Sequence, residues 1–183
     1  MMIRWNRFNI YFVACLAVML LCGCQSAERK RSKEFSVLHF HIETNPDPTG
    51  HTERIAIGPE HSVGLDVQKQ PFLTEANIKQ AKMMDVIGGF AVSIQLDRQG
   101  TWLLEEYTGA NRGNHLALFC KWTVPPDKKL NNGRWLAAPE IRTRISDGLL
   151  VFTPDATREE AEQIVFGLNN VAKRIDKEVT NRW

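Results

Sequence analysis

Apolar and polar residues alternate along residues 35–43, where Leu38, Phe40 and Ile42 fall on one side of the chain. A period of two predicts a β-strand with one buried face. Short apolar or alternating runs bounded by turn residues predict further extended segments, at residues 52–57, 62–68, 90–96, 116–122, 134–145 and 148–152. We therefore expect strands to make up much of the chain.

A different period follows residue 157. Thr157 and Glu160 form a capping box, which predicts a helix from Thr157 to about Lys177. Its apolar residues recur at spacings of three and four, which places them on one stripe: Ala161, Ile164, Val165, Leu168, Val171, Ala172 and Ile175.

Two shorter helices are predicted upstream. Residues 74–85 have Thr74 as a candidate N-cap and Ile78 and Ala81 as inner positions, and a second short helix is predicted around Gly100 to Tyr107. One-faced helices beside half-apolar strands predict the α+β class, as a two-layer sandwich in which a mostly antiparallel sheet carries helices on one face.

The N-terminus has the features of an export signal. Arg4 and Arg7 precede an uncharged run at residues 10–21, which is shorter than the roughly 20 apolar residues of a bilayer span. The Gly23–Cys24 junction that follows resembles the lipobox of bacterial lipoproteins. We therefore predict a signal peptide at residues 1–23 and a lipid on Cys24. The alternative is an uncleaved anchor helix.

This resemblance implies an architecture and a location. Residues 24–34 would be a charged tether, and residues 35–183 a single α+β domain in the bacterial cell envelope, facing the periplasm. The membrane would be a partner through the lipid on Cys24. Gln25 resembles the residue found after the cysteine in the outer-membrane sorting class of proteobacterial lipoproteins, so the outer membrane is favoured over the inner. Cys120 would remain as a buried thiol with no disulfide partner.

Net charge argues against nucleic acid as a partner. The chain has 23 Lys and Arg against 21 Asp and Glu, and removal of Arg4 and Arg7 would leave the mature protein neutral. A neutral surface has little attraction for phosphate backbones.

One constellation of side chains is worth weighing as a metal site. His39, His41 and Glu43 share a strand face at about 6.5 to 7 Å spacing, and His51 or His61 could add a ligand. The other interpretation, which we favour, is the solvent face of an amphipathic strand. We find no nucleophile elbow and no phosphate-binding loop, so we predict no catalytic residues, no metal and no small-molecule cofactor.

From residue 70 to about 170, the order of turn and core residues resembles the head part of the first periplasmic domain of SecD, a subunit of the SecDF accessory complex of bacterial protein export. The residues that carry the resemblance are Gln70–Thr74, Ile78, Ala81, Phe90–Asp97, Gly100, Thr108, Asn111, Gly113, Leu116, Ala117, Ala138, Pro139, Ile141, Ile145, Gly148, Thr157, Glu160, Ala161 and Leu168.

The resemblance implies this fold and a capacity to contact polypeptide. The chain departs from the family in a longer segment at residues 122–134, and no second apolar run follows residue 24 to carry the proton coupling of SecD. We therefore expect a non-enzymatic lipoprotein that binds an exported polypeptide or an envelope protein. The alternatives are a metal-dependent envelope enzyme that uses the His39 strand, and a structural lipoprotein that assembles with itself.

Overall fold

Strands dominate the structure, a computed structural model that describes residues 34–58, 63–124, 129–131 and 133–181. The strands are β1 (Ser36–Ile42), β2 (Thr52–Ile57), β3 (Val63–Gln68), β4 (Ile78–Val86), β5 (Gly89–Leu96), β6 (Leu116–Val124), β7 (Lys129–Leu130), β8 (Arg134–Ala137) and β9 (Leu149–Phe152). The helices are the 3-10 turn η2 (Glu75–Asn77), α2 (Arg98–Ala110) and α3 (Arg158–Thr180).

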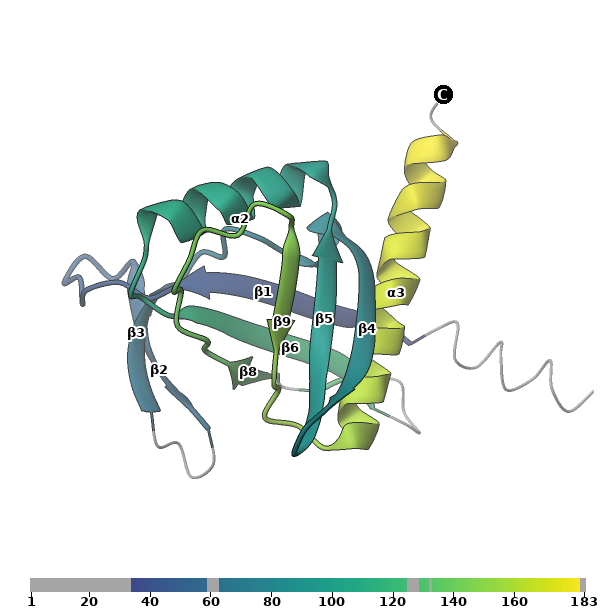
Figure 1. Cartoon of the computed structure of the whole chain (residues 1–183), viewed down its shortest axis with the longest axis horizontal. Coiled ribbons are helices and arrows are strands. Elements are labelled where there is room, and N and C mark those ends of the chain that lie inside the picture. The colour runs from purple at the N-terminus through teal and green to yellow at the C-terminus, as the bar shows by residue number, and fades with distance from the viewer. Residues whose placement is uncertain (1–33, 59–62, 125–128, 132, 182–183) are drawn as a thin grey trace, which may run out of the picture. The chain divides into compact units, whose positions relative to one another are not determined.

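The described strands form three antiparallel sheets (Figure 1). The first joins β1, β6 and β7, with β8 also paired to β6, and we call it the β1–β6–β8 sheet. The second is the β4–β5–β9 sheet, and the third is the β2–β3 hairpin. The predicted α+β class with antiparallel strands is confirmed.

The main core lies between the β1–β6–β8 and β4–β5–β9 sheets. Leu38, Phe40 and Ile42 are each at most 2% exposed, as the alternation of β1 predicted. They pack with inward residues of the second sheet and of both helices, including Val92, Ile94, Leu96, Leu104, Leu150, Phe152, Ala161, Ile164 and Leu168. The apolar stripe of α3 is thus part of one continuous core.

The predicted helix at residues 74–85 is wrong. Only Glu75–Asn77 is helical, and β4 begins at Ile78. Thr74 does cap this turn, because its hydroxyl accepts a hydrogen bond from the Ala76 N–H. A β-bulge between Ile78 and Gln80 lets Ile78 and Ala81 both face the core, which produces a helix-like spacing of three within a strand.

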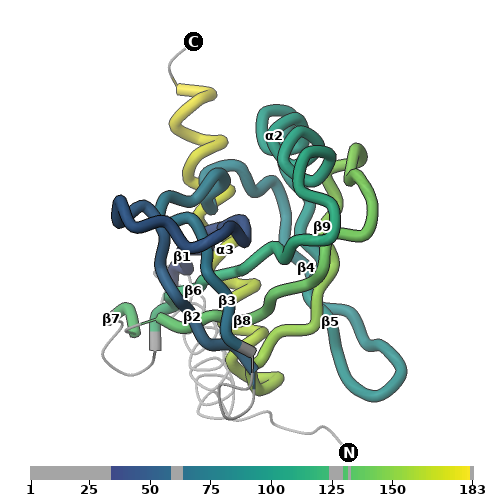
Figure 2. The backbone as a smooth tube through the Cα atoms, turned by 90° about the vertical axis from the view of Figure 1, so that its left-hand side faces the viewer, coloured from purple at the N-terminus to yellow at the C-terminus, as the bar shows by residue number. Residues whose placement is uncertain are grey.

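A second, smaller core lies on the opposite face of the β1–β6–β8 sheet. The β2–β3 hairpin covers this face and buries Ile55, Ile57, Leu65 and Val67 against Ala117, with Trp135 and Ala138 at the margin. In Figure 2, β2 and β3 run beside β6 and β8. The outer face of β1 is therefore partly covered by protein.

Helix α3 begins with the predicted capping box: the Thr157 hydroxyl accepts from the Glu160 N–H, and the Glu160 carboxylate accepts from the Thr157 N–H. Farther along, α3 passes very close to the first residue of β1. A Cβ added at Gly167 would lie 2.2 Å from the Ser36 Oγ and 2.7 Å from its backbone nitrogen. A residue without a side chain is therefore required at this crossing.

Within residues 34–58, 63–124, 129–131 and 133–181, neither helix has the length and apolarity needed to cross a bilayer.

Candidate functional site

The residues weighed as a metal site lie along the outer face of β1, and each of the three contacts a different group. The ring centroids of His39 and His41 are 6.1 Å apart. The Glu43 Oε2 accepts two hydrogen bonds from His115, one from its backbone N–H (2.8 Å) and one from Nδ1 (2.6 Å). The His39 Nε2 lies 4.0 Å from the Glu75 Oε2.

His41 is buried under the β2–β3 hairpin rather than facing solvent as an amphipathic strand would suggest. Its ring packs edge-on against Trp135, with centroids 5.0 Å apart, and its Nδ1 is 2.7 Å from the carbonyl oxygen of Gln68. Burial lowers the pKa of His41 below its ordinary value of 6.5. The neutral ring, with Nδ1–H donating to Gln68, therefore holds the hairpin on β1.

No group of three or more His, Cys, Asp or Glu positioned to hold a metal ion occurs among the described residues. The predicted signal peptide, Cys24 and most of the charged tether, at residues 1–33, lie outside the part of the chain that the structure describes, as does His61.

Cys120 is fully buried, and burial raises the pKa of its thiol, so the thiolate is strongly disfavoured. The tryptophans that could line a groove are dispersed. Trp122 is 3% exposed in the main core, Trp135 packs on His41, and Trp102 is 60% exposed on α2. Trp122 is therefore a core residue and Trp102 a surface residue.

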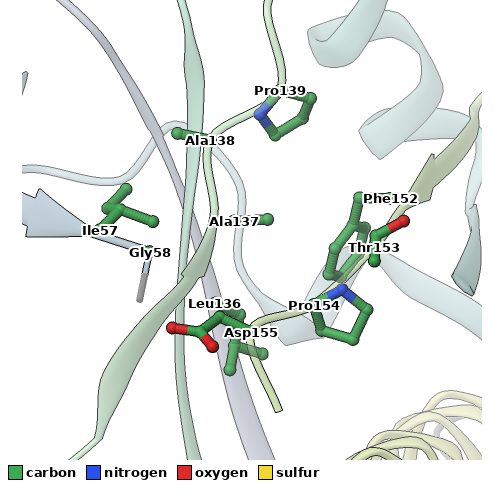
Figure 3. A pocket seen from close by; sticks show the side chains of 10 residues that line it. All are labelled: Ile57, Gly58, Leu136, Ala137, Ala138, Pro139, Phe152, Thr153, Pro154 and Asp155. Atoms are coloured by element: carbon green, nitrogen blue, oxygen red, sulfur yellow. The ribbon is translucent and has the colours of Figure 1, made fainter. Parts of the chain in front are cut away.

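An apolar groove separates β8 from the segment that follows β9 (Figure 3). Its volume, about 470 Å³, lies in the range of ligand clefts. In Figure 3, Ala137 points from β8 toward Phe152 and Thr153 across the groove. The lining residues are mostly apolar: Ile57, Gly58, Leu136, Ala137, Ala138, Pro139, Phe152, Thr153, Pro154 and Asp155. The sequence analysis did not find this site.

One backbone hydrogen bond crosses the groove, from the Asp155 N–H to the Leu136 carbonyl at 2.6 Å. It holds the segment after β9 against β8. Pro139 and Pro154 have no backbone N–H. An apolar group bound in the groove would therefore leave no hydrogen-bond donor unpaired at these two positions. The lining therefore suits apolar side chains.

The groove lining includes Phe152, the last residue of β9, and one edge of β9 is unpaired among the described strands. The hydrogen bond from the Leu96 N–H to the Gly148 carbonyl (2.9 Å) sets which residues of β9 bond to β5. By the alternation of antiparallel ladders, Leu150 and Phe152 bond to β5 while Leu149 and Val151 direct their backbone groups away from it. The Leu149 N–H donates to the Asp147 Oδ1.

Val151 therefore presents a free backbone N–H and C=O at this edge, because no described residue pairs with them. Its side chain is 44% exposed. An edge of this kind can accept an added strand from another polypeptide. The groove and the edge together form a candidate polypeptide-binding site, which we call the β8–β9 site.

The lengthened segment at residues 122–134 is partly described. β7 pairs with the end of β6, and the Asn131 side-chain oxygen accepts hydrogen bonds from the N–H groups of Trp122 and Gly133. Residues 125–128 and 132 lie outside the described part of the chain. The described residues therefore show a short hairpin extension of β6.

The fold is that of a small α+β domain with antiparallel sheets. Comparison with protein families gives a more specific result: residues 53–172 match the SecDF P1 head subdomain, so the chain belongs to that family. The match begins earlier than the resemblance at residue 70, since it includes the β2–β3 hairpin.

Two solved structures are similar to the chain. One is a structure of SecDF, described as a membrane component that enhances protein export, with 26% identity and a TM-score of 0.53 over 80% of this chain and 67% of that chain. The other is SecDF in a super-membrane-facing form, with 26% identity and a TM-score of 0.54 over 80% of this chain and 20% of that chain. The chain thus spans two thirds of the first and a fifth of the second. No curated protein matches it.

Proposed function

We propose that this chain is a lipid-anchored protein of the bacterial envelope whose domain binds extended polypeptide at the β8–β9 site and catalyses no reaction. The observation that carries the proposal is the free edge of β9 at Val151 beside an apolar groove. Family membership supports it, because SecDF is described as enhancing protein export.

Binding at this site would use two ordinary contributions. An extended segment would form backbone hydrogen bonds with the N–H and C=O of Val151 and place an apolar side chain in the groove between Ala137 and Phe152. Hydrogen bonds to the backbone are independent of sequence, so many exported chains would be accepted. Neither contribution needs an energy source, and we propose that binding is passive and weak.

A substitution at the edge tests this mode of binding. Val151→Pro removes the outward N–H and leaves the hydrogen bonds of Leu150 and Phe152 to β5 in place, a position at which an edge strand tolerates proline. Val151→Thr is the matched control, because it keeps the N–H and the β-branched shape.

The probe is a fluorescein-labelled ten-residue peptide of alternating valine and threonine, titrated by anisotropy. We expect Val151→Pro to weaken binding at least tenfold and Val151→Thr to change it less than twofold. Circular dichroism and urea unfolding would show whether each variant is folded. Equal affinity of a folded Val151→Pro variant and the unchanged protein would refute strand addition at β9.

The proposed anchor has a separate test. Cys24→Ala should abolish incorporation of a radioactive fatty acid in cells and leave a precursor that retains residues 1–23. Equal labelling of the variant and the unchanged protein would show that Cys24 is not the acylated residue. Fractionation of the labelled protein would then test the preference for the outer membrane that Gln25 suggests.

A further inference from the structure

The β4–β5 hairpin ends in an exposed, uncharged tip, which we define as residues 86–89. Val86 pairs with Gly89, so Ile87 and Gly88 make a two-residue turn. The Ile87 side chain is fully exposed, Val86 is 43% exposed, and Met84, behind the tip, is 38% exposed. Gly88 has a φ of 89°, which only glycine adopts readily, so the turn is a defined shape.

A charged pair braces the hairpin from α3. The Arg158 Nη2 lies 2.6 Å from the Asp85 Oδ1, and the Arg158 guanidinium also lies over the ring of Phe90. The tip is therefore held against the first turn of α3, and Figure 1 shows both at the end of the domain opposite α2. Three exposed aliphatic side chains, those of Met84, Val86 and Ile87, thus lie together on a braced hairpin.

We infer that the hairpin tip contacts the lipid surface of the membrane on which the domain is anchored, with Ile87 inserted among the headgroups. This inference rests on the proposed anchor at Cys24. Aliphatic side chains partition into the outer 5 to 10 Å or so of a bilayer, and residues 86–89 carry no charge that would have to be desolvated.

The length of the tether favours a lipid surface as the occupant. The chain joins the domain at Glu34, whose carbonyl accepts a hydrogen bond from the Asn170 side chain (2.9 Å). Asn170 and Arg158 are twelve residues apart on α3, or about 18 Å along the helix. The ten residues from Cys24 to Glu34 reach about 35 Å when extended, so the tether is long enough for the tip to meet the bilayer.

Two other occupants fit the tip less well. Three aliphatic side chains offer far less area than the roughly 1,200 Å² that a stable protein interface buries. An added strand would need a free edge, but the backbone of β4 at Ala81 is already bonded to Asn169 of α3.

Depth-dependent fluorescence quenching tests the inference. The full chain with Ile87→Cys, labelled with an environment-sensitive dye, is reconstituted in vesicles of phosphatidylethanolamine and phosphatidylglycerol that contain nitroxide-labelled acyl chains. The control label is at Glu106→Cys, an exposed position on α2 at the opposite end of the domain. Cys120 is buried and should not react in the folded protein.

We expect nitroxide lipid to quench the label at position 87 at least threefold more than the label at position 106, and Val86→Ser to reduce that difference. Equal quenching at both positions would overturn the inference, as would quenching that depends on the ratio of protein to lipid, since that would indicate contact between copies. The intact mass of the same preparation reports acylation separately. If Cys24 carries no lipid, residues 10–21 would still hold the precursor on the vesicle, and the same comparison is then made with Cys15, Cys22 and Cys24 replaced by serine so that only positions 87 and 106 are labelled.

Discussion

The side-chain amide of Asn169 on α3 forms two hydrogen bonds with the backbone of Ala81 on β4, both 2.9 Å long: the Ala81 N–H donates to Oδ1, and Nδ2 donates to the Ala81 carbonyl. The amide thus takes the place of a neighbouring strand at one edge of the β4–β5–β9 sheet. The opposite edge, at Val151, has no such cover among the described residues. This asymmetry makes β9 the edge available to a ligand.

Replacing this amide should destabilise the protein. Asn169→Ala leaves the Ala81 N–H and C=O without partners, and we expect the free energy of unfolding to fall by about 1 to 3 kcal/mol. Lys173→Ala, at an exposed position on the same helix, is the matched control and should change stability by less than about 0.5 kcal/mol. Urea unfolding followed by tryptophan fluorescence measures both. Equal stability of the two variants would mean that the amide contributes nothing at this edge.

The apolar stripe and the cap of α3 should contribute unequally. Leu168 is 1% exposed in the main core, so Leu168→Ala should cost about 2 to 5 kcal/mol through a cavity that cannot fully collapse. Thr157→Ala removes the hydroxyl that accepts from Glu160 and should cost about 0.5 to 2 kcal/mol. Urea unfolding compares them. A negligible loss at Leu168 would contradict the packing of α3 described here.

Stability should depend on pH through His41. Its folded pKa is lowered by burial, so below about pH 6.5 the unfolded chain takes up a proton that the folded ring resists. The contribution of His41 to the free energy of unfolding is therefore fully present above pH 6.5. It decreases as the pH falls from 6.5 toward the pKa of His41 in the folded protein. The slope is at most about 1.4 kcal/mol per pH unit for one group.

Urea unfolding at pH 7.5, 6.0 and 5.0 measures this dependence, with His41→Gln as the comparison because glutamine does not titrate. The stability difference between the two proteins should shrink as the pH falls. A difference that is constant across the three pH values would exclude His41 as the titrating group.

Metal content tests the alternative of a metal-dependent enzyme. We expect protein purified without a histidine tag to contain no stoichiometric zinc, because Glu43 is bonded to His115 and His41 to Gln68. Elemental analysis that finds about one metal ion per chain, lost in His41→Ala, would support the enzyme instead.

The spacing of apolar residues predicted the regular strands and helices correctly where burial follows the period of the element. The alternation of β1 and the stripe of α3 match the buried residues, because a regular element repeats its exposure with its own period. β4 was predicted as a helix because its bulge restores a spacing of three between Ile78 and Ala81. A bulge forms by pairing with β5, and a single-sequence pattern carries no information on that pairing.

The candidate site could not be predicted for a related reason. The groove brings Ala137 next to Phe152, and the free edge at Val151 exists because β9 pairs on one side only. The burial of His41 depends on where the β2–β3 hairpin folds back, at Gln68. Each of these relationships joins residues far apart in the sequence.

The most direct measurement is photocrosslinking in living cells from a benzophenone amino acid at Thr153, an exposed residue of the groove, with the same group at Glu106 on α2 as the control. If the β8–β9 site binds exported polypeptide passively, Thr153 should crosslink to secretory chains, Glu106 should not, and the crosslinks should persist after the membrane potential is removed with an uncoupler. Crosslinks that vanish on uncoupling, or that form only between copies of this chain, would contradict the proposed function.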